Sequence, residues 1–207
     1  MQLMMTLREH NYDDNALYDT FPFKIKDIMF SSILYMANMR LWRMAHVLGE
    51  ETSEIDEWMI RFEENLFARC WNDDESMFFD IDVTTNEQIK VHTVAALMPM
   101  ITGLLKERHV QAIDDVLNHT NFCGQQACAI NLAPSASLGG EHFNHKLYWR
   151  GPIWINVNWF LWKGFRVCHM EEEADEMKAA ILNLLYEQGF REYYSPTTGA
   201  GLGAKDF

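Results

Sequence analysis

Aromatic, cationic and amide side chains are concentrated in the stretch YWRGPIWINVNW, residues 148–159. A sugar site needs this mixture, because flat aromatic rings stack on the apolar C–H face of a pyranose while Arg and Asn offer forked hydrogen bonds to neighbouring hydroxyls. The alternative is that residues at helical spacing, such as Trp154, form the core face of a helix. Trp149 and Arg150 fit that alternative poorly, because they precede the expected helix and adjoin Gly151, where the backbone can approach a ligand.

A carboxylate lies in a second unusual stretch, GFREYYSPTTG, residues 189–199. Glu192 follows directly on an expected helix end and precedes two tyrosines and a turn rich in proline and glycine. Taken alone, a glutamate in such a place is an ordinary solvated loop acid. As a general base it would have to be ionised, held by its neighbours and within reach of a water molecule. Both interpretations of Glu192 stay open on spacing alone.

Two further patterns suggest binding chemistry but are better explained otherwise. The glycines of GAGLG, residues 199–203, resemble a phosphate-binding loop, yet their spacing differs from a dinucleotide fingerprint and no strand-to-helix context follows. Glu141, His142 and His145 match no zinc signature, so we assign them a solvated or structural role. We expect no metal ion and no other cofactor.

The two chemistry-bearing stretches together resemble the trehalase-like, six-hairpin glycosidases of glycoside hydrolase family sixty-three. The likeness is greatest to the mannosylglycerate and glucosylglycerate hydrolases and the bacterial α-glucosidases of that group. The segment FPFKIKDIMFSSILYMANMRLWRMAHVLG, residues 21–49, also looks like the family's helix downstream of its general acid. The resemblance therefore covers nearly the whole chain.

The resemblance implies an inverting α-glycoside hydrolase, α-glucosidase-like or α-mannosidase-like, that acts on small glycosides. In that family the glutamate of the EY-(F/Y)-x-P-x-T-G segment is the general base, which falls on Glu192. The family's Tyr-Trp-Arg-Gly-Pro segment lines the sugar subsite. The matching positions in this sequence are Tyr148, Trp149, Arg150, Gly151 and Trp154.

The chain departs from the family pattern near both of its ends. Family members carry a general-acid aspartate in a segment resembling ESGMDNSPRWD, and Asp13, Asp14 and Asp27 do not fit it. The family also continues beyond the glycine-rich turn. We therefore expect residues 1–207 to be a C-terminal portion of the catalytic domain, truncated at both ends, that is inactive alone. The alternative, from another functional class, is a non-catalytic carbohydrate-binding or assembly remnant.

Helices must position these residues, and apolar periodicity predicts three helical hairpins. The first pairs a helix at 27–48, stopped by Gly49, with a helix at 53–70 that Ser53 caps. Alternating apolar residues then predict a short β-excursion near residues 77–84.

The remaining two hairpins follow the same logic. The second pairs 91–105, which Pro99 kinks or begins, with 107–117. A long loop at 120–147 leads to the third hairpin, in which a helix opened by Gly151 and Pro152 precedes an acidic helix that ends at Gly189. The predicted fold is all-α, a partial (α/α)6 toroid of about three hairpins.

Composition narrows the class of protein further. A formal charge of −13 would repel a phosphate backbone, so nucleic acid is not an expected partner, and we interpret the charge as solvated negative surface. The four cysteines lack metal-ligand or disulfide-framework spacing, so we expect buried free thiols and a cytoplasmic location, although Cys123 and Cys128 are close enough in sequence to pair. No run of about eighteen apolar residues occurs, so we expect no membrane span.

Half of a six-hairpin ring would leave apolar helix faces open to solvent. Besides a carbohydrate substrate, the expected partners are therefore the missing N-terminal half of the toroid or a second copy. The glycosidase interpretation has one structural requirement, that Glu192 and the Trp149 region lie on the same side of the molecule.

Overall fold

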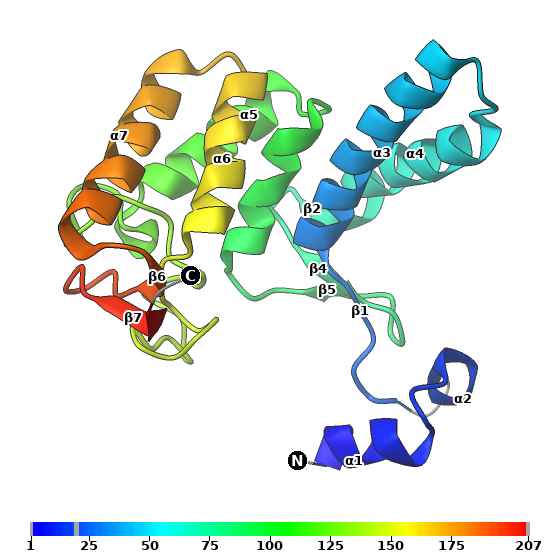
Figure 1. Cartoon of the computed structure of the whole chain (residues 1–207), viewed down its shortest axis with the longest axis horizontal. Helices are drawn as coiled ribbons and strands as arrows, with labels where there is room; N and C mark the ends of the chain where they lie inside the picture. Colours follow the sequence, from blue (N-terminus) through cyan, green and yellow to red (C-terminus); the bar gives the residue numbers. More distant parts are fainter. Residues whose placement is uncertain (1, 19–20, 206–207) are drawn as a thin grey trace.

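Three helical hairpins follow one another in the computed structural model, which describes residues 2–18 and 21–205 (Figure 1). The first pairs α3 (Ile28–Leu48) with α4 (Ser53–Asn65), which continues as the π-helix η1 (Leu66–Cys70). The second pairs the 3-10 helix η2 (Val94–Thr102) with α5 (Glu107–Asn118), and the third pairs α6 (Ile155–Val167) with α7 (Glu171–Gln188). Because α3 packs on η2, η2 on α6 and α6 on α7, the hairpins form an arc, the predicted partial helical toroid.

Helix α3 has the bounds that its sequence predicts. The Asp27 carboxylate accepts a hydrogen bond from the Phe30 N–H at 2.8 Å, which satisfies one of the free amides at the helix start. Gly49 ends the helix in the left-handed conformation with φ 74°, where a side chain would be strained. Local caps at both ends thus explain why this prediction is confirmed.

Helix α4 differs from its prediction in how it begins. Thr52 occupies the cap position and Ser53 is the first helical residue, so the prediction that Ser53 caps the helix is wrong. The Thr52 hydroxyl donates to the Asp56 carboxylate at 3.0 Å, a side-chain bond in place of a backbone cap. The cap residue therefore lies one position earlier than the spacing between Ser53 and Asp56 suggested.

The segment predicted as a helix at 91–105 is a shorter 3-10 helix in the centre of the core. Every residue of η2 is buried, including Pro99 in its interior. Proline lacks the amide hydrogen and its ring clashes with the carbonyl four residues back, so an ordinary α-helix is disfavoured there. Helices α3 and α6 pack on either side of η2, which is therefore the middle of the arc.

Short strands connect the helices. The predicted β-excursion appears as β3 (Met77–Phe78) and β4 (Asp80–Asp82). Strand β3 pairs with β2 (Trp71–Asn72), while β4 lies between β1 (Ile25–Lys26) and β5 (Gln88–Ile89), all antiparallel. The Asp80 carboxylate accepts a hydrogen bond from the Ile28 N–H at 2.8 Å, which ties the three-stranded sheet to the start of α3.

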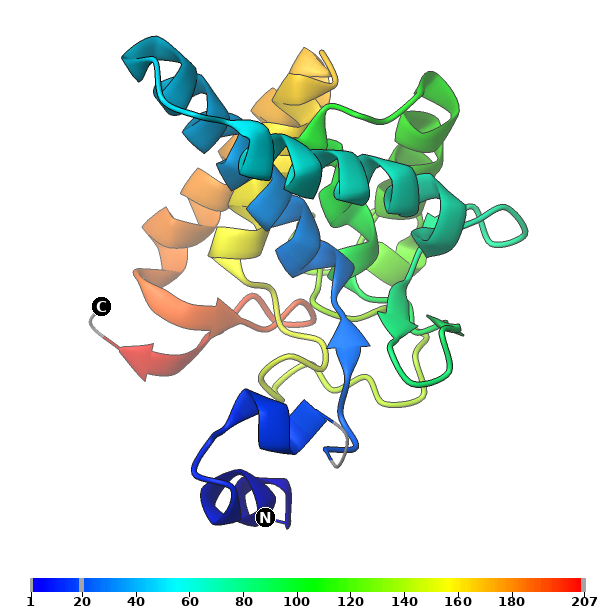
Figure 2. The same ribbon diagram turned by 90° about the vertical axis from the view of Figure 1, so that its right-hand side faces the viewer.

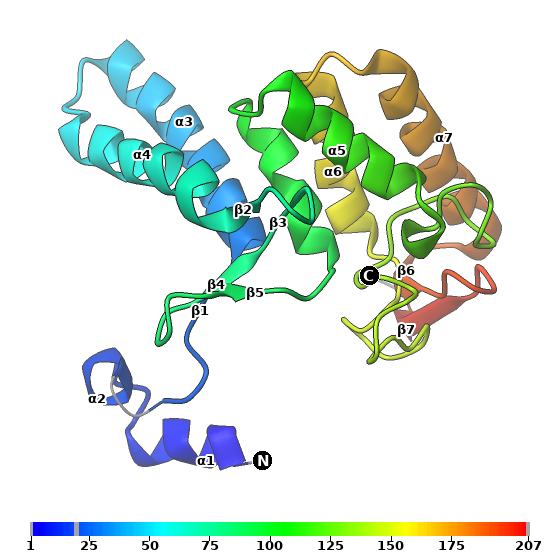
Figure 3. The same cartoon turned by 180° about the vertical axis from the view of Figure 1, so that it is seen from behind.

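Two features were not predicted from the sequence. Helices α1 (Gln2–Glu9) and α2 (Asp14–Tyr18) precede the first hairpin and lie at one end of the molecule, below β1 (Figure 2). Near the other end of the chain, β6 (Arg191–Tyr194) and β7 (Gly201–Lys205) form an antiparallel hairpin beneath α7 (Figure 3). Glu192, interpreted from sequence as a loop acid, therefore lies on a strand. None of the helices in the described residues is long and apolar enough to cross a membrane.

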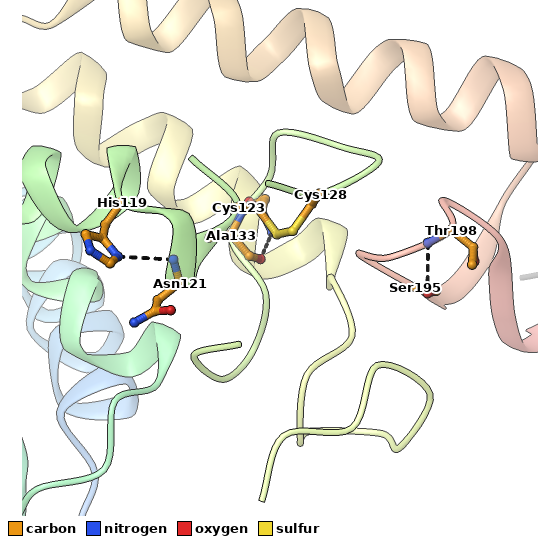
Figure 4. Close-up of a disulfide and its surroundings, with 8 residues drawn as sticks. His119, Asn121, Cys123, Cys128, Ala133, Ser195 and Thr198 are labelled. Atoms are coloured by element: carbon orange, nitrogen blue, oxygen red, sulfur yellow. Dashed lines mark hydrogen bonds between the residues drawn. A yellow bond between two sulfur atoms is a disulfide. The ribbon is translucent and has the colours of Figure 1, made fainter. Parts of the chain in front are cut away.

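The long loop contains a disulfide between Cys123 and Cys128, with 5.0 Å between their Cα atoms (Figure 4). The prediction of free thiols is therefore wrong for this pair. Positive φ angles at Cys123, Gln125 and Gln126 turn the chain back on itself, which brings the two Cα atoms within disulfide reach. The other two cysteines are free and, because burial raises the pKa of each thiol to about 11, they stay protonated at neutral pH.

Candidate functional site

The aromatic stretch lies outside the helix that it precedes. Helix α6 begins at Ile155, later than predicted, and Trp154 is its extended cap residue. Gly151 has φ 153°, and a Cβ there would lie 2.6 Å from the Phe143 ring and 2.8 Å from the Asn144 carbonyl oxygen. Only glycine lets the chain pass so close to the long loop.

Four rings form a cluster, called here the aromatic platform, made up of Tyr148, Trp149, Trp154 and Tyr193. Trp149 stacks on Trp154 with centroids 4.0 Å apart and planes 4° apart, and Tyr148 meets Trp154 edge-on at 5.0 Å. Trp154 is only 8% exposed, whereas Trp149 and Tyr148 are 40% and 48% exposed. The Trp154 indole N–H donates to the Tyr148 carbonyl oxygen at 3.1 Å. Trp154 is thus the buried support beneath two accessible rings.

Glu192 lies beside this platform. Its Oε2 atom accepts a hydrogen bond from the Ala204 N–H at 3.0 Å, across the β6–β7 hairpin. The close approach depends on Gly203, whose φ is 72° and whose added Cβ would lie 2.5 Å from the same Oε2 atom. Partial desolvation, the negative charge of Glu192 and a hydrogen bond to its carboxylate raise the pKa of Tyr148. The carboxylate is therefore held between a strand amide and the edge of the platform.

Backbone pairing brings the two stretches together. The Ile153 N–H donates to the Tyr194 carbonyl oxygen at 2.8 Å, and the Tyr194 N–H returns a bond to the Ile153 carbonyl oxygen at 2.9 Å. The His145 Nδ1 and buried Ser195 Oγ atoms make a further hydrogen bond at 2.8 Å. As a result Tyr148 contacts both Trp149 and the ring of Tyr193, the residue next to Glu192.

Arg150 points toward a neighbouring hollow. Its Nε donates to the His142 carbonyl oxygen at 3.1 Å. Arg150 and Trp149 line a hollow of about 630 Å³ together with the segment 90–93 and the loop 136–143. Trp149 is thus common to the platform and to this hollow.

Asn158, one of the two amides in the aromatic stretch, has a structural role. It is fully buried, its Oδ1 accepts from the Ala133 N–H at 2.9 Å, and its Nδ2 donates to the Ala133 and Trp154 carbonyl oxygens at 3.0 Å. The Asn158 amide is therefore used within the fold and is not free to bind a sugar hydroxyl. Asn156, the other amide, is exposed on the same helix.

Sequence reasoning missed the contributions of Tyr193, His145 and Ser195 to this region. The run Arg191 to Tyr194 followed by a glycine-rich turn is a hairpin signal that would have placed Glu192 and Tyr193 on a strand. His145 carried no local signal, because its partner Ser195 is distant in sequence.

Two of the three aspartates near the chain's start act as local caps. Asp27 caps α3, and the Asp13 carboxylate accepts a hydrogen bond from the Asn15 N–H at 2.9 Å. Asp14 is exposed in the first turn of α2.

Comparison with known proteins gives a consistent picture. Residues 1–207 match the sequence profile described as the mannosylglycerate hydrolase MGH1-like glycoside hydrolase domain. The chain is 35% identical over 207 residues to the mannosylglycerate hydrolase of Thermus thermophilus, covering 100% of this chain and 48% of that protein. It is 26% identical over 205 residues to the glucosylglycerate hydrolase of Mycolicibacterium hassiacum, covering 98% of this chain and 46% of that protein. The chain thus spans about half the length of these relatives.

Solved structures agree with the sequence comparison. The family-63 mannosylglycerate hydrolase of Thermus thermophilus in complex with Tris and D-glycerate superposes with a TM-score of 0.90 at 34% identity, covering 98% of this chain and 48% of that chain. Neutral trehalase Nth1 of Saccharomyces cerevisiae gives a TM-score of 0.56 at 13% identity, covering 86% of this chain and 35% of that chain, a likeness of fold alone.

Proposed function

This chain belongs to the mannosylglycerate hydrolase MGH1-like family of glycoside hydrolases, and from that premise we propose that it supplies the general base and part of the sugar subsite of an inverting α-glycosidase. The proposed base is Glu192. The observation that carries this assignment is the position of its carboxylate, held by the Ala204 N–H at 3.0 Å beside the exposed Tyr148 ring.

In the proposed reaction Glu192 takes a proton from a water molecule as the water oxygen bonds to the anomeric carbon. The bond from that carbon to the leaving oxygen breaks, and a separate acid protonates the leaving oxygen. Attack from the face opposite the leaving group inverts the configuration. The hydrogen bond from Ala204 supports this role, because its donor is a backbone N–H, which orients the carboxylate but cannot itself take the proton from the water molecule.

The proposed sugar subsite has two kinds of residue. Trp149 and Tyr148 offer accessible aromatic surface for the C–H face of a sugar ring, and Arg150 offers a guanidinium beside it. Trp154 and Gly151 are buried, so we assign them supporting roles beneath Trp149 and along the backbone.

The general acid is proposed to come from outside these residues. Asp13 and Asp27 already serve as local caps. The Thermus relative is about twice as long as the stretch that it shares with this chain. We therefore propose that these residues alone do not hydrolyse glycosides efficiently. The names of the relatives support an α-mannoside or α-glucoside of a small hydroxy acid, such as glycerate, as the substrate.

The test assays the chain alone and co-produced with the half of the Thermus enzyme that it does not match. Proton NMR follows the anomeric signals released from α-mannosylglycerate and α-glucosylglycerate. We expect turnover only in the co-produced sample, with the β-anomer appearing first. Glu192→Gln should abolish turnover, while Glu187→Gln, on the exposed side of α7, should leave it unchanged.

Two outcomes would contradict the proposal. An α-anomer as first product would mean retention and remove the general-base role of Glu192. Sugar binding by calorimetry with no turnover in either sample would favour the non-catalytic carbohydrate-binding alternative.

A further inference from the structure

The two accessible rings of the aromatic platform lie on a short loop that is closed by its own backbone. The Asn144 N–H donates to the Arg150 carbonyl oxygen at 2.6 Å, across the ends of the segment 144–150. This segment, called here the platform loop, includes Tyr148 and Trp149. Because the closing bond is local, it shapes the loop but does not fix where the loop lies relative to β6, the strand of the proposed base.

Two side-chain contacts join the platform loop to β6 and the residue after it. The Tyr148 ring meets the Tyr193 ring edge-on, with centroids 5.6 Å apart. The Nδ1 atom of half-buried His145 lies 2.8 Å from the Oγ atom of Ser195, which directly follows β6. A ring contact tolerates sliding, whereas a hydrogen bond weakens steeply as its angle departs from linear. The bond between His145 and Ser195 is therefore the directional link between loop and strand.

Ser195 is itself held firmly in the turn between β6 and β7. Its side chain is fully buried, and its N–H donates to the Ala200 carbonyl oxygen at 2.9 Å. Its hydroxyl oxygen accepts the Thr198 N–H at 3.3 Å (Figure 4). Glu192 lies on the strand that leads into this turn. A bond from His145 to Ser195 thus reaches a fixed point of the hairpin that carries the base.

The partners of Ser195 indicate which side of this bond donates. Its hydroxyl accepts the Thr198 N–H, and its own hydrogen needs an acceptor because the side chain is buried. Within the described part of the chain, the His145 Nδ1 atom is placed to take that hydrogen. The neutral imidazole ring then carries its own hydrogen on Nε2.

We propose that His145 is a positioning residue of the glycosidase. By accepting the Ser195 hydroxyl hydrogen at Nδ1, it sets the distance between the platform loop and Glu192. This inference rests on the proposed function, because that distance is the one between a bound sugar and the base. A displacement of about 1 Å between reacting groups can cost about a hundredfold in rate, so the link has a large effect on turnover.

Substitutions at His145 test the link in the chain co-produced with the half of the Thermus enzyme that it does not match. For α-mannosylglycerate, His145→Ala should lower kcat at least about tenfold per folded enzyme and change KM less than about threefold, because the sugar still binds the rings of an intact loop. His145→Asn should keep kcat within about threefold of the wild type, since the Asn Oδ1 atom, like Nδ1, is bonded to Cγ. His145→Gln moves the acceptor one bond further out and should lose as much as His145→Ala. Lys146→Ala, exposed on the same loop, is the matched control.

A second measurement does not depend on turnover. In the same co-produced samples, the nuclear Overhauser effect between the Tyr148 and Tyr193 ring hydrogens reports the distance between loop and strand. We expect it to be similar in the wild type and His145→Asn, and clearly weaker in His145→Gln. Nitrogen-15 chemical shifts of the neutral His145 ring should show the hydrogen on Nε2.

Several results would overturn the proposal. They are a wild-type kcat in His145→Gln, an equal loss in Lys146→Ala, a His145→Asn variant as slow as His145→Gln, an unchanged Overhauser effect in His145→Gln, or a ring hydrogen on Nδ1. The comparison of the Asn and Gln variants remains decisive if His145→Ala does not fold. A wild-type sample without turnover would instead refute the proposed function, and the Overhauser effect would still decide whether His145 positions the loop.

Discussion

Replacing Asn158 by alanine should strongly destabilise the fold. Ala133 is 2% exposed, and its N–H and C=O both lose their partner when the amide is removed. An unsatisfied buried backbone group costs about 1 to 3 kcal/mol, so two of them give a loss of about 4 kcal/mol. The Trp154 carbonyl adds little to this loss, because it still accepts the Asn158 backbone N–H at 3.1 Å.

Urea unfolding followed by tryptophan fluorescence measures the effect. Asn156→Ala is the matched control, since Asn156 is exposed on the same helix and makes the same change in helix propensity. Its free energy of unfolding should change by no more than about 0.5 kcal/mol. With a denaturant slope of about 3 kcal/mol per molar, the Asn158 variant should unfold more than about 1 M earlier.

The opposite result would assign a ligand-binding role to Asn158. If Asn158→Ala changed the free energy of unfolding by no more than Asn156→Ala, yet removed sugar binding, the amide would be a ligand group after all. The reasoning from the Ala133 hydrogen bonds would then be refuted.

Two further predictions concern the carboxylates. Gly203→Ala should lower turnover of the co-produced enzyme at least tenfold, because the new Cβ would lie 2.5 Å from the Glu192 Oε2 atom. The control is Gly49→Ala, which has a similar φ of 74° but no atom within 4 Å of its Cβ, and which should lose only about 1 to 2 kcal/mol of stability. Equal turnover in both variants would refute this reasoning. Burial raises the pKa of Asp80, so the folded state binds its proton more tightly than the unfolded chain and stability falls as pH rises above about 4. In the Asp80→Asn variant the amide oxygen can still accept the Ile28 N–H, so the variant should raise the free energy of unfolding at pH 7 but not below about pH 4. Urea unfolding measures this difference, and a variant less stable than the wild type at pH 7 would contradict the predicted direction.

The helices were predictable where local signals stood at both ends. Asp27 and Gly49 bound α3 by a cap and a left-handed stop, and α7 ends at Gln188, directly before Gly189. The segment around Pro99 was not predictable in this way. All residues of η2 are buried, so its sequence contains no polar face. Without a polar face, the sequence has no periodicity that could distinguish a 3-10 helix from an α-helix.

The candidate site could be predicted only in part. The two motifs indicated which residues to examine, but their meeting depends on the bridge between Ile153 and Tyr194, which no local periodicity encodes. The disulfide was missed for a similar reason. Cys123 and Cys128 meet because three residues adopt positive φ, and neither glycine nor asparagine marks those positions.

Main-chain links help to hold Glu192 and the aromatic platform at their mutual distance. Besides the Ile153 bridge, the Ala129 N–H donates to the Pro196 carbonyl oxygen at 2.9 Å, so the disulfide loop also holds the turn that follows β6. Backbone bonds of this kind do not depend on which side chain lies above them. In the proposed site the accessible rings of Tyr148 and Trp149 are the groups left to meet a sugar, while the position of Glu192 is fixed by backbone links within the β6–β7 hairpin and to the neighbouring loops.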